Sequence, residues 1–123
     1  MLVRTWNLFH GNTVPPGRKA YLRTMVELIS AGAPDIVCLQ ELPAWALESV
    51  GAWSGMQAIT ARAKRPHLVG FPIGASLGRA LTAPNHGRFR SGFAGQGNAI
   101  LLPKDAQIRK VKVITLNTNV FWE

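Results

Sequence analysis

The sequence has little of three features that define whole classes of protein. Its single cysteine, Cys38, excludes an internal disulfide framework, and a lone thiol in an apolar run indicates a reducing compartment. No apolar run exceeds four residues, far short of the roughly 20 that cross a bilayer. The first residues also lack the charged and apolar regions of an export signal. We therefore expect a cytoplasmic protein without a membrane span.

Acidic residues are also scarce, and they are unevenly placed. The sequence has six Asp and Glu and fourteen Lys and Arg, which gives a net charge of +8. No carboxylate occurs between Ser49 and Lys104, whereas that interval contains Arg88, Arg90 and other basic side chains. A field of one sign attracts anions such as DNA or RNA, phosphorylated lipids or free phosphate esters, and it does not distinguish among them. Charge alone leaves open a second interpretation, in which these side chains form a solvated basic face.

The apolar content of the sequence indicates one folded domain over residues 1–123, since 47% of the residues are apolar. Residues 2–8 alternate apolar and polar side chains and predict a strand. Residues 18–30 place apolar side chains three or four apart and predict an amphipathic helix. Residues 36–39 are all apolar, which is typical of a central strand covered on both faces. Strand, helix and buried strand in this order predict a βαβ unit.

The second part of the sequence carries weaker patterns. Gly and Pro punctuate it, and the apolar stretches between them are short. No internal repeat or change of composition divides it. The patterns predict a short helix at 44–50, a strand at 56–63, a short helix at 73–81, a long loop at 83–97 that carries Arg88 and Arg90, and a hairpin of strands 98–102 and 108–116.

Two polar residues stand at the carboxyl ends of the predicted parallel strands. They are Asn7 and Glu41, and neighbouring strand ends would bring them together beside a ligand crevice. A carboxylate and an amide form a partial site for Mg²⁺, which takes few protein ligands and completes its shell with water and substrate oxygens. The period of two predicts that Gln40 and Glu41 point to opposite faces. A solvated or capping glutamate remains the alternative.

The sequence contains TWNLFHG at residues 5–11, PDIVCLQE at residues 34–41 and GNAIL at residues 97–101. In order and spacing, these three stretches resemble signatures of the endonuclease/exonuclease/phosphatase family, which includes deoxyribonuclease I. The resemblance implies the α/β fold class, as the first half of a four-layer sandwich with mixed sheets. It also implies hydrolysis of phosphate esters with Mg²⁺ or Mn²⁺, by a phosphodiesterase, nuclease or phosphatase.

By position, the resemblance makes Glu41 the metal ligand and Asn7 the neighbour that orders metal and phosphate. It assigns no role to Asn98. The basic loop makes Arg88 and Arg90 candidate contacts for the phosphate-ester substrate. His10 follows Asn7 closely, and we interpret it as a loop histidine that meets solvent, with a substrate contact as the alternative.

The family's Asp-x-Asn pair and its Ser-Asp-His signature have no counterpart in these 123 residues. The resemblance thus covers about the first half of the family's domain. Three hypotheses follow. The chain is a fragment of a hydrolase, a non-catalytic basic module that binds nucleic acid by charge, or a half domain completed by a partner chain.

Overall fold

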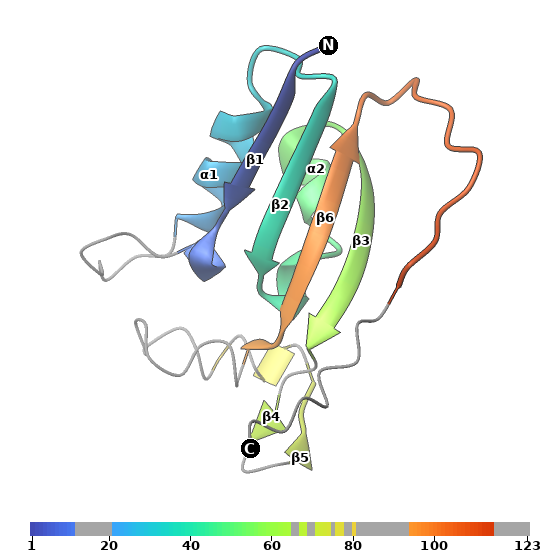
Figure 1. Cartoon of the computed structure of the whole chain (residues 1–123). Helices are drawn as coiled ribbons and strands as arrows, with labels where there is room; N and C mark the ends of the chain where they lie inside the picture. Colours follow the sequence, from blue (N-terminus) through green and yellow to red (C-terminus); the bar gives the residue numbers. More distant parts are fainter. Residues whose placement is uncertain are drawn as a thin grey trace, which may run out of the picture.

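The computed structural model describes residues 1–11, 21–64, 67–68, 71–74, 76–77, 80 and 94–114. Its centre is a four-stranded mixed sheet with the strand order β1–β2–β6–β3, and helices lie behind one face (Figure 1). A separate ribbon pairs β4 with β5. The elements are β1 (Val3–Asn7), η1 (Phe9–Gly11), α1 (Leu22–Ser30), β2 (Ile36–Leu42), η2 (Ala44–Ala46), α2 (Val50–Ser54), β3 (Gln57–Lys64), β4 (His67–Leu68), β5 (Phe71–Pro72) and β6 (Gln96–Leu102).

The predicted βαβ unit is confirmed. β1 and β2 pair in parallel, with α1 between them in the chain. The spacing of three and four residues in α1 buries Leu22, Val26 and Ile29, as an amphipathic helix requires. The strand predicted at 56–63 is also present as β3, and it pairs with β6 in antiparallel fashion. The fold class is therefore α/β with a mixed sheet.

The two faces of the sheet have different surroundings. In β6, burial alternates, so that Gly97, Ala99 and Leu101 are buried while Asn98 and Ile100 are exposed. The buried set forms one core with the helices. We call the opposite side the open face, defined by Thr5, Asn7, Gln40, Cys38, Ile59, Ala61, Asn98 and Ile100. Within the described ranges helices cover only one face, whereas the sequence predicted that residues 36–39 are covered on both.

The predicted hairpin is wrong in its second strand. Residues 108–114 form no strand, although their apolar and basic side chains alternate. The reason lies in the sheet order, because β6 already pairs with β2 along one edge and with β3 along the other. A following strand therefore has no free edge of β6 to pair with, and the chain leaves the sheet after Leu102.

The helix predicted at 44–50 is also misplaced. Residues Ala44–Ala46 form a 3₁₀ turn, and the α-helix begins only at Val50. Gly51 lies inside this helix rather than after it, and the helix ends at Gly55, whose φ of 67° provides the left-handed cap. The predicted helix at 73–81 and loop at 83–97 lie largely outside the described residues.

Arg4 fastens β1 to the carboxyl end of α1. Its Nη1 donates hydrogen bonds to the carbonyl oxygens of Ile29 at 2.7 Å and Ala31 at 2.5 Å. Ile29 belongs to the last turn of the helix and Ala31 is its C-cap residue. Carbonyl groups at this end lack partners within the helix, and a cation is favoured beside them. The contact holds α1 against the sheet, so the βαβ unit does not depend on apolar packing alone.

Replacement of this guanidinium should therefore lower stability. Arg4→Met keeps the apolar stem and removes both hydrogen bonds, and we expect it to lower the free energy of unfolding in urea by about 1–2 kcal/mol. Arg23→Met is the matched control, because the exposed pair of Arg23 with Glu27 should contribute less than about 0.5 kcal/mol. Equal losses in the two variants would contradict a special role for Arg4.

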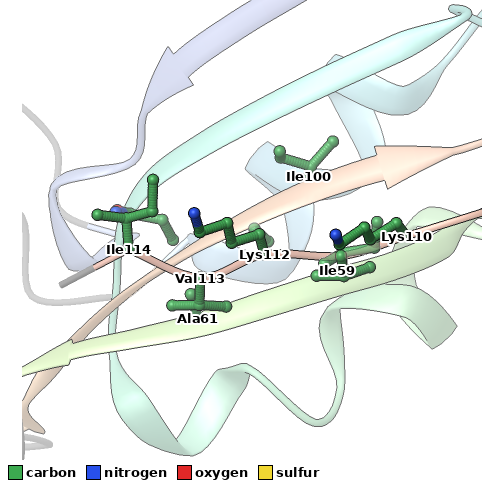
Figure 2. A pocket seen from close by; sticks show the side chains of 10 residues that line it. Ile59, Ala61, Ile100, Lys110, Lys112, Val113 and Ile114 are labelled. Carbon is green, nitrogen blue, oxygen red and sulfur yellow. The ribbon is translucent and has the colours of Figure 1, made fainter.

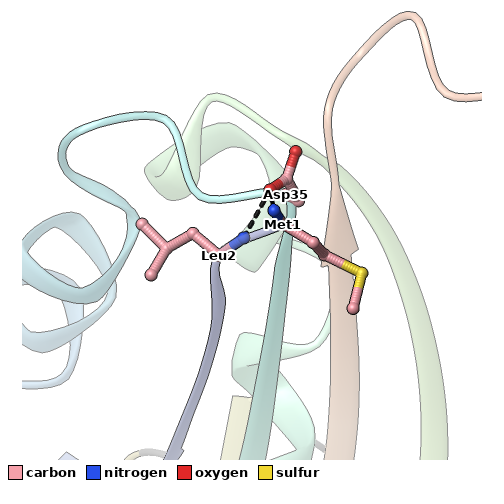
Figure 3. A network of polar contacts seen from close by, with 3 residues as sticks. All are labelled: Met1, Leu2 and Asp35. Carbon is pink, nitrogen blue, oxygen red and sulfur yellow. Dashed lines mark hydrogen bonds and ion pairs between the residues drawn. The ribbon is translucent and has the colours of Figure 1, made fainter.

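Asp35 organises the other end of the sheet, where the chain enters β1. Its Oδ2 accepts the backbone N–H of Leu2 at 2.5 Å and lies 3.8 Å from the terminal amine of Met1 (Figure 3). The backbone N–H groups of Asp35 and Ile36 in turn donate to the carbonyl oxygen of Leu2. These contacts fix the register between β1 and β2, and this register determines which side chains meet at the far end.

Candidate functional site

Asn7 and Glu41 meet at the carboxyl ends of β1 and β2. Asn7 Nδ2 donates a hydrogen bond of 2.9 Å to Glu41 Oε1, and Asn7 Oδ1 accepts the backbone N–H of Phe9 at 3.0 Å. Because a backbone N–H can only donate, this second bond determines which end of the amide faces Glu41. The juxtaposition expected from parallel strand ends is therefore present, on the open face of the sheet.

A β-bulge places Glu41 on this face. In the pairing of β2 with β6, Leu39 stands opposite Ala99 and Leu42 opposite Gly97, so two residues of β2 occupy the space of one. Glu41 is the bulged residue with φ of 55°, in the left-handed region. A side chain other than glycine in this region costs on the order of 1–2 kcal/mol, and such strain often accompanies functional sites.

The bulge corrects the predicted orientation of Glu41 relative to Gln40. The period of two placed Gln40 and Glu41 on opposite faces, yet both contact β1 residues of one face. Gln40 Nε2 donates to Thr5 Oγ1 at 3.1 Å, while Glu41 contacts Asn7, two residues further along β1. The extra residue interrupts the alternation, so Glu41 joins Gln40 on the open face. The contact between Gln40 and Thr5 is one that sequence reasoning missed.

A signal for the bulge was nevertheless present in the sequence. Val37 and Leu39 are two residues apart, but the next buried residue, Leu42, follows after three. A regular strand would have buried residue 41 instead. A change of the apolar spacing from two to three at a strand end thus marks the place where Glu41 leaves the regular pleat.

Asn98 lies opposite the bulge on β6. It occupies the position between Gly97 and Ala99, across from Gln40 and Glu41, and its side chain is exposed on the open face. Adjacent strands lie about 5 Å apart, so Asn98 is an immediate neighbour of the bulged pair. On its other side stands Ala61 of β3, whose small side chain leaves the amide uncovered.

His10 is buried, in contrast to its interpretation as a solvent-exposed histidine. Only 8% of its surface is accessible, whereas the preceding Phe9 is exposed. The cause is the tight turn η1, in which both residues have positive φ values, 44° for Phe9 and 55° for His10, and the N–H of Gly11 bonds back to Leu8. The remaining candidates, Arg88 and Arg90, lie outside the described residues.

The side-chain groups that meet at this site are a carboxylate and amides. Glu41 offers a carboxylate with Oε2 still available for a cation, and Asn7 has a second amide hydrogen to donate. No group of three or more His, Cys, Asp and Glu gathers in the part of the chain that the structure describes. A carboxylate and an amide are donors that hard cations such as Mg²⁺ take, together with several waters.

The fold and this cluster define an α/β protein with an oxygen-donor site at the ends of two parallel strands. The chain belongs to the endonuclease/exonuclease/phosphatase family, whose model matches residues 5–119. Members of this family act on phosphate esters and generally use a divalent metal ion. Comparison with curated proteins and with solved structures gave no match. Among the described helices, none has the length and apolarity to cross a membrane.

Proposed function

We propose that this chain is the metal- and phosphate-binding part of a Mg²⁺-dependent phosphoesterase, a nuclease or phosphatase that hydrolyses phosphate ester bonds. The observation that supports the proposal most directly is the contact between Asn7 and Glu41 at the carboxyl ends of β1 and β2. Ligand sites in open α/β sheets lie at this edge, because the connecting loops diverge there. Family membership supplies the reaction class independently of that geometry.

Glu41 is the ligand in this proposal. Among the described residues, its carboxylate is hydrogen-bonded to Asn7 through Oε1, so Oε2 can bind a cation such as Mg²⁺ or Mn²⁺. A divalent ion bound there would neutralise charge on the phosphoryl oxygens. The bulge holds the carboxylate on the open face, and a rigid strand end limits its motion, so little ordering remains to be done when the ion binds.

Asn7 orients this carboxylate and faces the phosphate. One hydrogen of Nδ2 is used on Glu41, and the second can donate to a phosphoryl oxygen. The bond from the N–H of Phe9 prevents the amide from flipping, which would turn an oxygen toward the carboxylate and toward the phosphate. Asn7 therefore favours an anionic substrate next to a carboxylate that would otherwise repel it.

Titration with Mn²⁺, followed by the loss of the free-ion signal in electron paramagnetic resonance, tests the proposed site. We expect wild type to bind Mn²⁺, Mg²⁺ to compete, and Glu41→Gln to weaken binding at least tenfold. Glu48→Gln is the matched control, because Glu48 is an exposed carboxylate outside the site. Hydrolysis of bis(4-nitrophenyl) phosphate is measured in parallel. Equal Mn²⁺ affinity in Glu41→Gln and wild type would contradict the proposal.

A basic module that binds nucleic acid by charge is the second candidate function. Lys104, Arg109, Lys110 and Lys112 are all exposed on the segment after β6, with Asp105 as the single acidic side chain among them. In that case DNA affinity would fall steeply with salt, binding would not require Mg²⁺, and Glu41→Gln would not weaken it. Binding that requires both Mg²⁺ and Glu41 would instead favour the phosphoesterase.

A further inference from the structure

We propose that Asn98 is a substrate-contacting residue, whose amide binds the phosphate ester between the Asn7–Glu41 pair and a hollow on the open face. This inference rests on the proposed function and extends it to a residue to which neither the family resemblance nor the strand-end pattern assigns a role. It follows from the register of β6, from the exposure of the Asn98 side chain and from the shape of the neighbouring surface.

The register provides the first argument. The bulge sets Gln40 and Glu41 together across from Asn98, so one strand carries the carboxylate and the next strand carries an amide directly opposite. Gln40 is already bonded to Thr5, and Glu41 to Asn7. The amide of Asn98 has no hydrogen-bond partner among the residues that the structure describes. Within the described ranges, the Asn98 amide is therefore available to a ligand at this end of the sheet.

The hollow provides the second argument. It has a volume of about 410 Å³ and is bounded by Asn98, by the apolar side chains of β3 and β6, and by residues 110–114. Figure 2 shows its sides, with Ile59 and Ala61 from β3 and Ile100 from β6 facing the segment of Lys110 and Lys112. Asn98 thus borders the hollow on one side and the bulged Glu41 on the other.

The chemistry of the walls suits an organic phosphate. The floor of isoleucine and alanine side chains accepts an apolar or aromatic group, while Lys110 and Lys112 supply positive charge beside it. Asn98 stands where the phosphoryl oxygens of such an ester would lie if its phosphate reached Glu41. An amide can donate to these oxygens without adding charge, so it would bind the ester without displacing the cation.

Calorimetric titration with phenyl phosphate in the presence of Mg²⁺ tests this assignment. We expect Asn98→Ala to bind phenyl phosphate about tenfold more weakly than wild type, and Asn98→Asp more weakly still, because a second carboxylate repels the anion. Mn²⁺ affinity should stay unchanged in Asn98→Ala. Gln57→Ala is the matched control, since Gln57 is an amide on the same face of β3 that pairs with Leu102 at the far end.

Two adverse results are distinguishable. If Asn98→Ala binds phenyl phosphate as wild type does, while Glu41→Gln loses Mg²⁺-dependent binding, the role of Asn98 is refuted and the proposed function stands. If Glu41→Gln retains wild-type binding of both Mn²⁺ and phenyl phosphate, the proposed function fails, and the inference about Asn98 fails with it. Circular dichroism of each variant establishes that it is folded before it is titrated.

Discussion

Glu41→Val is expected to lose divalent-cation binding and stability together, whereas Glu41→Gly should lose cation binding alone. Both substitutions remove the carboxylate, so Mn²⁺ affinity should fall at least tenfold in each. They differ in the backbone, because residue 41 has φ of 55°. Glycine adopts this conformation readily, while a β-branched side chain is strongly disfavoured there.

The stabilities should therefore separate the two variants. In Glu41→Gly, relief of backbone strain offsets the lost bond to Asn7 and the greater freedom of the unfolded chain, and we expect stability within about 1 kcal/mol of wild type. Glu41→Val should be less stable than Glu41→Gly by about 1–2 kcal/mol. Urea unfolding measures both. A Glu41→Gly variant much less stable than Glu41→Val would show that the bulge is not under strain.

This outcome would show that residue 41 is glutamate for a functional reason. A position that favours glycine for the backbone and yet holds a carboxylate carries a cost in stability. The cost is localised, since the neighbouring residues of β2 keep regular pairing with β1 through Gln40. Strain at one residue, next to a satisfied hydrogen-bond network, is typical of a site held ready for a ligand.

Local patterns were sufficient to predict β1, α1 and β2. Each has a clear period over several residues, and the contacts between them link segments that are near in sequence. The prediction of a hairpin after β6 was wrong for the opposite reason. Its own pattern of apolar and basic residues is compatible with a strand. Whether it pairs depends on β3, which comes from an earlier, distant part of the sequence and occupies the edge of β6.

The candidate site was predictable only in part, for a similar reason. Asn7 and Glu41 follow from strand ends, which a period reveals, and their contact follows from parallel pairing. The position of Asn98 beside them depends on the register between β2 and β6, and that register contains an irregularity of one residue. Periodicity alone assumes a regular strand, so it would bury residue 41 and send Glu41 to the face opposite Gln40.

Gly97→Ala is expected to destabilise the fold, because Gly97 lies in β6 with its α-carbon against neighbouring atoms on the buried face. A Cβ atom at this position would lie 2.7 Å from Leu47 Cδ1 and 2.9 Å from the backbone oxygen of Ala61. The side chain of Leu47 could shift, but the oxygen is fixed by the pairing of β3 with β6. Overpacking of this kind costs about 1–3 kcal/mol, and urea unfolding should show a loss in that range.

A double mutant separates the two contacts. Leu47→Ala opens space beside residue 97, so the added loss on introducing Gly97→Ala into it should be smaller than in wild type by about 0.5–1 kcal/mol. The remaining loss reports the clash with the Ala61 oxygen. Gly74→Ala is the control, because its nearest neighbour, Ser76 Oγ, would lie 4.0 Å away. If Gly97→Ala is as stable as Gly74→Ala, Leu47 and the Ala61 oxygen do not approach Gly97 as closely as the structure shows. The position of β6 next to Asn98 would then also be in error.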